Sequence, residues 1–340
     1  MTTRANAQWR LAARPSGLFK PSDFQWAEEP LRPVGDGDVL VRNVYLSLDP
    51  TNRGWANATP TYLPPIPLGE VMRGIALGVV EESRNPAFSP GDLVQGLIGW
   101  QRYLVGNGRG LSVVPRVPGL PMTAYLGLFG HIGATAYFGL LDVGHPKAGE
   151  TLVVSGAAGA VGSLVGQIGK IVGCRVVGIA GGPEKCRWLT ETLGFDAAID
   201  YKREPVRPRL RVLCRQGIDV YFDNVGGDIL DAALSIINLR ARVVICGLIS
   251  QYTSDEPPPG PRYFGNILVQ RARVEGFIVL DYAERFPEAM KALAAWYTQG
   301  KIQYRVEVVD GLEQAPAAVN RLFDGSHHGK LIVKVGEEPS

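Results

Sequence analysis

Gly156-Ala157-Ala158-Gly159-Ala160-Val161-Gly162 is the stretch that decides the fold of this 340-residue chain. The apolar run Thr151-Leu152-Val153-Val154-Ser155 precedes it and predicts a buried strand, and a helical pattern over 164–172 follows it. A strand, a glycine turn and a helix in this order place a helix N-terminus against a pyrophosphate, whose charge the backbone amides and the helix dipole offset. A nucleotide cofactor is therefore the first hypothesis.

The segments that follow predict further parts of the same sheet. We expect a buried strand over 174–180, a helix from Pro183 towards Gly194, and short strands over 197–199, 219–222 and 243–246. Apolar strands that alternate with helices indicate an α/β fold with a doubly wound parallel sheet. In this context a dinucleotide-binding turn is favoured over an ordinary tight turn.

The end of the second strand indicates which dinucleotide is bound. An NAD site usually has an acidic residue there, about 20 residues after the glycines, but this chain has Ala180-Gly181-Gly182. The first acid, Glu184, falls in the first turn of the next helix, where a surface role is expected. Lys185 and Tyr201 could jointly bind the additional phosphate of NADP, although Lys185 alone is typical of a solvated helix. The missing acid and this pair predict NADP(H).

Composition limits the other classes of protein. A chain with 46% hydrophobic residues can bury a substantial core in two domains, and a net charge of +2 gives no broad case for nucleic acid or an anionic membrane. The arginines over 203–215 are interpreted as a solvated helix face. No uninterrupted apolar run of about 18 residues and no signal peptide are evident, so a soluble, cytoplasmic protein is expected.

Cysteine and histidine are scarce and scattered. The four cysteines lack a CxxC pair, which argues against both a disulfide framework and a structural zinc site. His327 and His328 are adjacent but have no nearby cysteine or acidic pair, so no metal site is predicted.

The flanking regions differ from the central sheet. Short strands over 39–46, 75–80 and 93–98, punctuated by proline and glycine, are typical of an irregular β-domain. A helical pattern over 124–141 leads into the nucleotide-binding strand, and another helix is expected over 287–298. The final strand, 331–335, could return to the β-domain.

Several motifs together resemble one known family over nearly the whole chain. They lie at 47–50, 68–74, 135–141, 156–167, 194–196, 222–227 and 246–252. The chain is similar to the zinc-independent medium-chain dehydrogenase/reductases, in the branch of the prostaglandin, alkenal and curcumin reductases. The resemblance implies a Rossmann doubly wound sheet plus a GroES-like β-rich catalytic domain. The domains would be 1–128 for substrate and catalysis, 129–298 for NADP binding, and 299–340 as a return to the catalytic domain.

The resemblance also implies a reaction. Zinc alcohol dehydrogenases of the superfamily carry Gly-His-Glu where this chain has Leu68-Gly69-Glu70, and their cysteine-rich lobe is missing here. Without a metal to polarise an alcohol, the implied reaction is metal-free hydride delivery from NADPH to the β-carbon of an α,β-unsaturated aldehyde or ketone. The α-carbon then takes a proton from a phenol, the cofactor ribose or water.

The cofactor-binding residues that the resemblance implies are spread over the chain. They are Gly156, Gly159, Ala160, Val161, Gly162, Lys185, Tyr201, Asn224, Cys246, Gly247, Ile249, Ser250, Tyr252, Phe277, Ile278, Val279 and His327. His327 stands where relatives usually have an asparagine, and imidazole can also donate a hydrogen bond.

The expected substrate side departs further from the family. Many relatives have a pocket tyrosine where this chain has Thr51, and a second one where it has Val269. Tyr62, Tyr252 and Tyr263 remain as phenols, and each is equally compatible with a packing role. We predict that Tyr252 orders the cofactor and that Tyr62 contacts substrate.

Two other functions stay open from the residues alone. One is an NADPH quinone oxidoreductase with the same cofactor site, and the other is a non-catalytic dinucleotide-binding sensor or structural protein. A homodimer is expected from the family, and the apolar runs 236–238 and 243–245 could supply either its sheet edge or core strands.

Overall fold

The computed structural model describes residues 4–117, 119–254, 256 and 258–339. The chain divides into two compact units. One, the β unit, runs to Leu126 and resumes at Val306, and the other, the parallel-sheet unit, is Gly127–Arg305.

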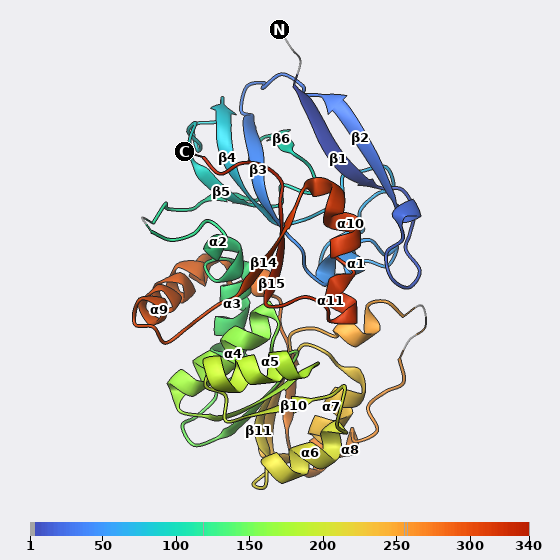
Figure 1. Cartoon of the computed structure of the whole chain (residues 1–340), viewed down its shortest axis with the longest axis vertical. Helices are drawn as coiled ribbons and strands as arrows, with labels where there is room; N and C mark the ends of the chain where they lie inside the picture. The colour runs from blue at the N-terminus through green and yellow to red at the C-terminus, as the bar shows by residue number, and fades with distance from the viewer. Residues whose placement is uncertain (1–3, 118, 255, 257, 340) are drawn as a thin grey trace. The chain divides into compact units, whose positions relative to one another are not determined.

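The parallel-sheet unit is built on a six-stranded sheet (Figure 1). Its strands are β8 (Thr151–Ser155), β9 (Arg175–Ala180), β10 (Ala197–Asp200), β11 (Ile218–Asp223), β12 (Ile237–Ile245) and β13 (Arg273–Gly276). The order is β10-β9-β8-β11-β12-β13 and every pair is parallel. The predicted doubly wound sheet is therefore confirmed, and its strand order reverses between β8 and β11, where such sheets bind ligands.

Side chains of these strands alternate between two cores. Leu152 and Val154 of β8 belong to one apolar cluster and Val153 to the other. A strand buried on both faces requires this apolar run without polar interruptions, as the sequence has it. Helices cover both faces, because residues of α4 (Ala160–Val172) join the first cluster and residues of α6 (Val206–Leu213) and α7 (Gly227–Leu234) join the second.

The helices and helical turns of this unit connect its strands. They are α3 (His131–Phe138), η2 (Gly139–Gly144), α4 (Ala160–Val172), α5 (Pro183–Arg187), η3 (Trp188–Thr192), α6 (Val206–Leu213), α7 (Gly227–Leu234), η4 (Ile249–Gln251), α8 (Gly265–Val269), η5 (Val279–Arg285) and α9 (Phe286–Thr298). A further short helix, α2 (Ala124–Gly127), lies where the two units meet in sequence.

The helical pattern predicted over 124–141 is interrupted. The chain leaves helical conformation between the end of α2 at Gly127 and the start of α3 at His131. Among the described residues, Ala124–Gly144 is the one helical segment long and apolar enough to cross a membrane, with a mean hydropathy of 1.3. Two thirds of the most apolar part of this segment is buried, and Ile132, Ala136 and Leu140 belong to the core of the parallel-sheet unit. Its apolar character is accounted for by this packing.

The apolar runs 236–238 and 243–245, considered above for the sheet edge of a dimer, lie in the core of the sheet. Residues 237–245 form β12, which pairs with β11 on one side and with β13 on the other. Within the described residues β13 is the outer strand on this side of the sheet, and all four of its residues are exposed.

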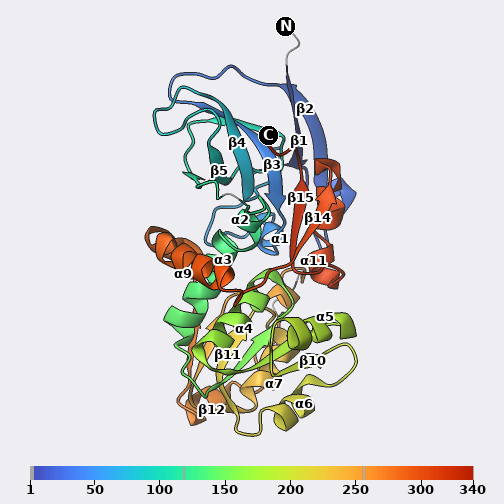
Figure 2. The same ribbon diagram turned by 60° about the vertical axis from the view of Figure 1, so that its left-hand side comes forward.

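The β unit contains a two-stranded and a seven-stranded sheet among the described residues. Its strands are β1 (Ala5–Leu11), β2 (Phe24–Pro30), β3 (Val39–Ser47), β4 (Ala76–Ser83), β5 (Leu93–Gly96), β6 (Tyr103–Gly106), β7 (Leu111–Val113), β14 (Val306–Asp310) and β15 (Lys330–Lys334). Its helical segments are η1 (Pro21–Asp23), α1 (Thr51–Trp55), η6 (Leu312–Gln314), α10 (Ala315–Ala318) and α11 (Arg321–Asp324). Figure 2 shows β15 between β14 and β3, so the predicted return of the final strand to the β-domain is confirmed.

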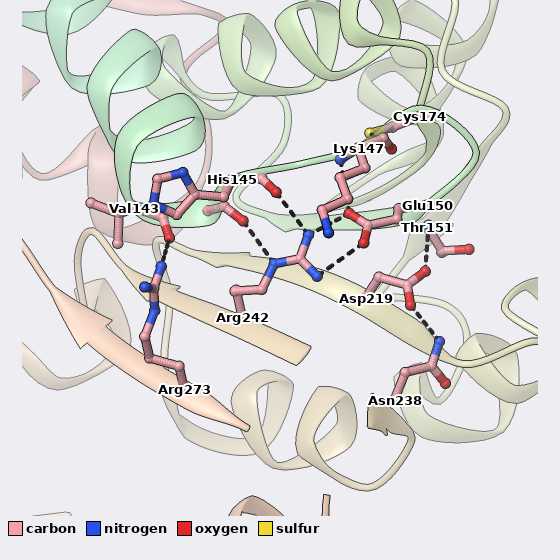
Figure 3. Close-up of polar contacts among 11 residues, drawn as sticks. Val143, His145, Lys147, Glu150, Thr151, Cys174, Asp219, Asn238, Arg242 and Arg273 are labelled. Atoms are coloured by element: carbon pink, nitrogen blue, oxygen red, sulfur yellow. Dashed lines mark hydrogen bonds and ion pairs between the residues drawn. The ribbon is translucent and has the colours of Figure 1, made fainter. Parts of the chain in front are cut away.

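The amino edge of the parallel sheet is held by a polar network. Figure 3 shows the guanidinium of Arg242 facing Glu150 and the carbonyl of His145. Arg242 Nη1 lies 3.0 Å from Glu150 Oε1, and its Nε donates to Gly144 O at 2.9 Å. Asp219 accepts from Thr151 N–H and from Asn238 Nδ2. Because these groups satisfy one another, this edge is a structural one.

Candidate functional site

The predicted cofactor residues of the parallel-sheet unit share one edge of its sheet. The glycine turn follows β8, Lys185 follows β9, Tyr201 follows β10, Asn224 follows β11, and the loop beginning at Cys246 follows β12. Phe277 follows β13 in the same way. Because all six strands are parallel, these segments emerge at the carboxyl edge, opposite the Arg242 network.

The glycine turn fits an anionic ligand. Helix α4 begins after Gly159 without a side-chain cap and without an acidic residue in its first turn. Gly159, Ala160 and Val161 are partly exposed, and the first amides of a helix have no intrahelical acceptor. A Cβ on Gly162 would lie 2.4 Å from Gly156 O, so only glycine allows the helix to start so close to the turn. The geometry suits a phosphate group of a dinucleotide.

A phenol and a lysine from the segment after β10 pack against the end of the second strand, β9. A Cβ on Gly181 would lie 2.9 Å from the Tyr201 hydroxyl and 3.0 Å from Lys202 Cε, so both side chains pack against this glycine. Asp200 Oδ1 accepts from Gly182 N–H at 2.8 Å and from Lys202 N–H at 3.1 Å. The carboxylate thereby ties the two loops together.

Lys185 and Glu184 lie on α5, beyond the Gly181–Gly182 turn. Lys185 is half-buried, and Glu184 is exposed and lies 3.5 Å from Arg305. This ion pair supports the surface role predicted for Glu184. Tyr201 directly follows Asp200, the last residue of β10, and its side chain is half-exposed.

Asp223, at the end of β11, connects three of these loops. Its carboxylate is fully buried and accepts from Ser155 Oγ at 2.7 Å, Tyr221 Oη at 2.8 Å, and Val225 N–H and Gly226 N–H at 3.0 Å. Its backbone oxygen accepts from the N–H groups of the first two residues after β12. Burial raises the pKa of Asp223, while these donors act in the opposite direction.

Asn224 is held between the glycine turn and the loop after β12. Its N–H donates to Ser155 Oγ at 2.8 Å and its Nδ2 to Ser155 O at 2.7 Å, while its carbonyl accepts from Ile249 N–H at 3.2 Å. The side-chain amide is therefore fixed by the residue that precedes the first glycine of the turn.

The loop 246–252 folds back on β11. Ser250 Oγ donates to Val225 O at 2.6 Å, and Leu248 N–H donates to Tyr252 Oη at 3.1 Å. A Cβ on Gly247 would lie 3.3 Å from the same hydroxyl, so the phenol of Tyr252 covers this glycine. Burial raises the pKa of the Cys246 thiol to about 12, which keeps it protonated and unreactive at neutral pH.

Phe277 has a packing role as well as its place at the sheet edge. A Cβ on Gly139 would lie 2.3 Å from the Phe277 ring, and this ring meets that of Phe222 at 6.4 Å, edge to face. Its side chain is directed into the core. Ile278 is extended, and Val279 begins η5.

In the β unit, Tyr62 lies beside the short helix α1. Its hydroxyl is 2.7 Å from Thr51 Oγ1, its ring packs edge to face against Trp55 at 6.4 Å, and 45% of the residue is exposed. Burial of the phenol raises its pKa, and the hydroxyl of Thr51 opposes this effect.

His327 lies in the turn before β15. Its Nδ1 is 2.8 Å from Arg321 O. Because a carbonyl oxygen only accepts, Nδ1 carries a proton and donates this hydrogen bond. No group of three or more His, Cys, Asp or Glu side chains arranged to hold a metal ion occurs in the part of the chain that the structure describes.

Thr51, Asp223 and Lys202 are functional candidates that the sequence did not single out. Asp223 lies within the motif 222–227, but nothing in the sequence distinguishes a buried acceptor from a solvated acid. Lys202 directly follows Tyr201, and its approach to Gly181 depends on the pairing of β10 with β9.

Comparisons with known proteins agree along the whole chain. A model of the N-terminal domain of oxidoreductases matches residues 7–114, and a model of zinc-binding dehydrogenases matches residues 160–295. The chain is 45% identical to the NADPH-dependent curcumin reductase of Escherichia coli (strain K12), over 97% of each chain. It is 40% identical to prostaglandin reductase 1 of Rattus norvegicus, over 96% of this chain and 98% of the relative.

A solved structure shows the same fold. The crystal structure of CurA from Vibrio vulnificus in complex with NADPH is 42% identical in sequence and covers 98% of this chain and 100% of its own, with a TM-score of 0.93. These matches, and the site geometry with them, show that the chain belongs to the medium-chain dehydrogenase/reductase family, in its zinc-independent reductase branch.

Proposed function

We propose that this protein uses NADPH to reduce the carbon–carbon double bond of α,β-unsaturated aldehydes and ketones, with hydride added to the β-carbon. The observation that carries the cofactor assignment is the end of β9, where Ala180-Gly181-Gly182 contains no acid, Tyr201 packs against Gly181, and Lys185 lies in the helix that follows. An acidic residue at this position would repel the additional phosphate that NADP carries on its ribose 2′-oxygen, whereas a cation and a hydroxyl attract it. The names of the relatives support the reaction class.

The proposed cofactor contacts follow the carboxyl edge of the sheet. The amides of Ala160 to Gly162 would bind the pyrophosphate beside Gly159, whose own N–H donates to Gly156 O at 2.9 Å, and Lys185 and Tyr201 would bind the additional phosphate. Asn224, the loop 246–252 and the backbone of Phe277, Ile278 and Val279 would line the nicotinamide. Bound NADPH supplies the hydride. His327 is proposed as a further contact, through the Nε2 side of its ring, since Nδ1 is bound to Arg321 O.

Two phenols are proposed for the chemistry. As hydride arrives at the β-carbon, negative charge develops on the carbonyl oxygen and the α-carbon needs a proton. We propose that Tyr252 orders the cofactor, since Leu248 N–H and Gly247 fix its position. Tyr62 would contact substrate, since its ring is partly exposed and its hydroxyl is held by a single neighbouring helix.

We further propose that the reaction needs no metal. A conjugated carbonyl already polarises its alkene, so phenol donors can stabilise the developing charge without a Lewis acid. The Leu68-Gly69-Glu70 segment, which lacks the histidine of the zinc enzymes, supports this proposal. Activity should therefore survive prolonged treatment with a chelator, and a loss that zinc restores would contradict it.

The test of the function is a substrate panel for the purified protein. NADPH oxidation is followed with enals, straight-chain enones, ring-containing enones and quinones, with NADH in parallel, and the products are identified. Saturated aldehydes or ketones formed with NADPH are expected. Equal kcat/KM with NADH would contradict the cofactor assignment. NADPH binding without turnover would favour a sensor, and semiquinone products would favour a quinone oxidoreductase.

We propose that the active form is a homodimer joined through the β13 edge. β13 leaves its outer hydrogen-bonding groups unpaired within the described residues, and an edge of this kind can pair with a second copy. Nearby apolar side chains are exposed, with Leu268 82% accessible and Phe264 and Val269 also solvent-facing. Light scattering should give a dimer, and Val274→Lys should give a monomer. A wild-type monomer at micromolar concentration would overturn this proposal.

Domain roles and compartment complete the assignment. We propose residues 1–128 as the GroES-like substrate domain, 129–298 as the NADP-binding domain and 299–340 as the return to the first. A cytoplasmic location is proposed because all four cysteines are free thiols, as is usual in a reducing compartment. Cell fractionation tests the location.

A further inference from the structure

We propose that Thr51 is a positioning residue: its hydroxyl holds the phenol of Tyr62 in the orientation from which that phenol donates a proton to substrate. The inference rests on the proposed function and adds a residue to the site. The distance of 2.7 Å between Thr51 Oγ1 and Tyr62 Oη is the direct observation. It joins two segments that lie 11 residues apart in sequence.

Thr51 itself is held by a buried polar scaffold at the start of α1. Asp49 Oδ1 accepts from the ammonium of Lys330 at 2.7 Å, and Ser47 Oγ lies 2.5 Å from Asp49 Oδ2. The side chain of Lys330 is almost fully buried, and its ammonium also donates to Leu48 O at 2.7 Å. A buried ion pair with several hydrogen bonds restricts the geometry of the groups that form it. The residue two positions after Asp49 is therefore restricted in position.

The next residue strengthens this anchor. Asn52 Oδ1 accepts from Asp49 N–H at 2.8 Å, and Asn52 Nδ2 donates to Arg73 O at 3.1 Å. Asn52 is fully buried. Helix α1 is thus tied both to its own first turn and to the segment that leads into β4.

The ring of Tyr62 also contacts Trp55, and Arg73 supports both Trp55 and the loop that carries the tyrosine. Trp55, almost fully buried, packs against the Tyr62 ring edge to face, and the guanidinium of Arg73 lies over the Trp55 ring at 5.6 Å. Arg73 Nη1 donates to Pro64 O at 2.9 Å, which fixes the loop that carries Tyr62. With the ring packed against Trp55, the hydroxyl of Thr51 sets the direction of the phenol O–H.

The surroundings of the phenol suit a proton donor. Burial raises the pKa of Tyr62, whereas the hydrogen bond with Thr51 and the positive charge of Arg73 lower it. When Thr51 donates to the phenol oxygen, it stabilises the phenolate that remains after proton transfer.

Water replaces the proton that Tyr62 gives to the substrate. Hydride adds to the β-carbon, NADPH is oxidised to NADP⁺, and the substrate double bond is reduced. The O–H bond of Tyr62 breaks as a C–H bond forms at the α-carbon. The phenolate recovers a proton from water, which reaches the half-exposed ring.

The test is a double-mutant cycle with Thr51→Val, Tyr62→Phe and the double variant, with Thr51→Ser as the matched control. Thr51→Val preserves shape but removes the hydroxyl, so kcat for an enone should fall about three- to tenfold, the range of one hydrogen bond. KM for NADPH should not change. Thr51→Ser should restore kcat, and Thr51→Val should have no effect when Tyr62 is already phenylalanine. Independent effects of the two single variants, or full activity of Thr51→Val, would overturn the inference.

A second readout separates this inference from the proposed function. The NMR resonance of isotopically labelled Tyr62 Cζ, assigned by its loss in Tyr62→Phe, reports the hydrogen bond to the phenol without turnover. It should move in Thr51→Val and return in Thr51→Ser. An unmoved resonance overturns the inference even if enones are reduced. A moved resonance in a protein that reduces no enone supports the Thr51 contact and refutes the reductase assignment.

Discussion

Lys185 is the residue on which the choice of NADPH over NADH should depend most. Loss of one charge-assisted phosphate contact costs about 1.5–3 kcal/mol, so Lys185→Ala should raise KM for NADPH roughly tenfold to hundredfold. KM for NADH should barely change, because that cofactor lacks the additional phosphate. Steady-state kinetics with both cofactors measure this. Lys334→Ala is the control, because Lys334 of β15 forms an ion pair on the surface with Glu337. If Lys185→Ala reduced activity equally with both cofactors, Lys185 would have a structural role.

Asp223 provides a second prediction at this scale. Its carboxylate accepts from four buried donors, two of them hydroxyls and two backbone amides. Asp223→Ala would leave these donors unpaired and should lower the free energy of unfolding by about 3 kcal/mol, with a higher KM for NADPH. Asp223→Asn keeps an acceptor oxygen and should lose less on both measures. Urea unfolding and cofactor kinetics report the two effects, and an alanine variant as stable as wild type would contradict the role described for Asp223.

At the scale of the element, the start of α4 is the feature most sensitive to one added carbon. A Cβ on Gly162 would lie 2.4 Å from Gly156 O and 2.9 Å from Ala157 Cα, and backbone atoms cannot move aside as a flexible side chain can. Gly162→Ala should therefore displace the helix N-terminus and weaken NADPH binding at least tenfold. Calorimetric titration with NADPH measures this.

Gly265 gives the matched control for that substitution. It begins α8 with ordinary helical backbone, and a Cβ there meets no atom within 4 Å. Gly265→Ala should leave NADPH affinity unchanged, because alanine favours a helix and no contact is disturbed. If both variants bound NADPH as wild type does, the close approach at Gly162 would have no functional role.

At the scale of the whole molecule, the Glu150–Arg242 pair makes stability depend on pH. Burial would raise the pKa of Glu150, but hydrogen bonds from Arg242 and from Lys147 N–H, with their positive charge, lower it. A carboxyl whose folded pKa is lowered contributes stability above its ordinary value of 4.5 and loses it as the pH falls through the folded value. The parallel-sheet unit should therefore lose stability in acid below about pH 4.5.

Glu150→Gln isolates this contribution. At pH 7 it should lower the free energy of unfolding by about 2 kcal/mol, because Arg242 loses its charged acceptor, and the difference from wild type should shrink as the pH falls below 4.5. Urea titrations at several pH values measure it. Glu184→Gln, in an exposed pair, should have little effect. A deficit of the same size at every pH would contradict the assignment.

The sequence by itself determined the parallel sheet and the position of the glycine turn after its first strand. Apolar runs such as 151–155 can only be buried on both faces, and glycines 156, 159 and 162 mark where the backbone must approach closely. Ala180-Gly181-Gly182 indicated NADP(H), because the sequence alone shows that no acidic residue stands at this position.

Only the tertiary structure decided which side chains meet. It broke the helix expected over 124–141 between Gly127 and His131 and made β12 an interior strand. It also brought Thr51 to Tyr62, Lys202 to Gly181, and four donors to Asp223. The physical reason is the distance in sequence over which each feature is set. The periodicity of a strand or helix depends on neighbouring residues, whereas a hydrogen bond between two loops depends on strand register and on the packing of residues that are distant in sequence.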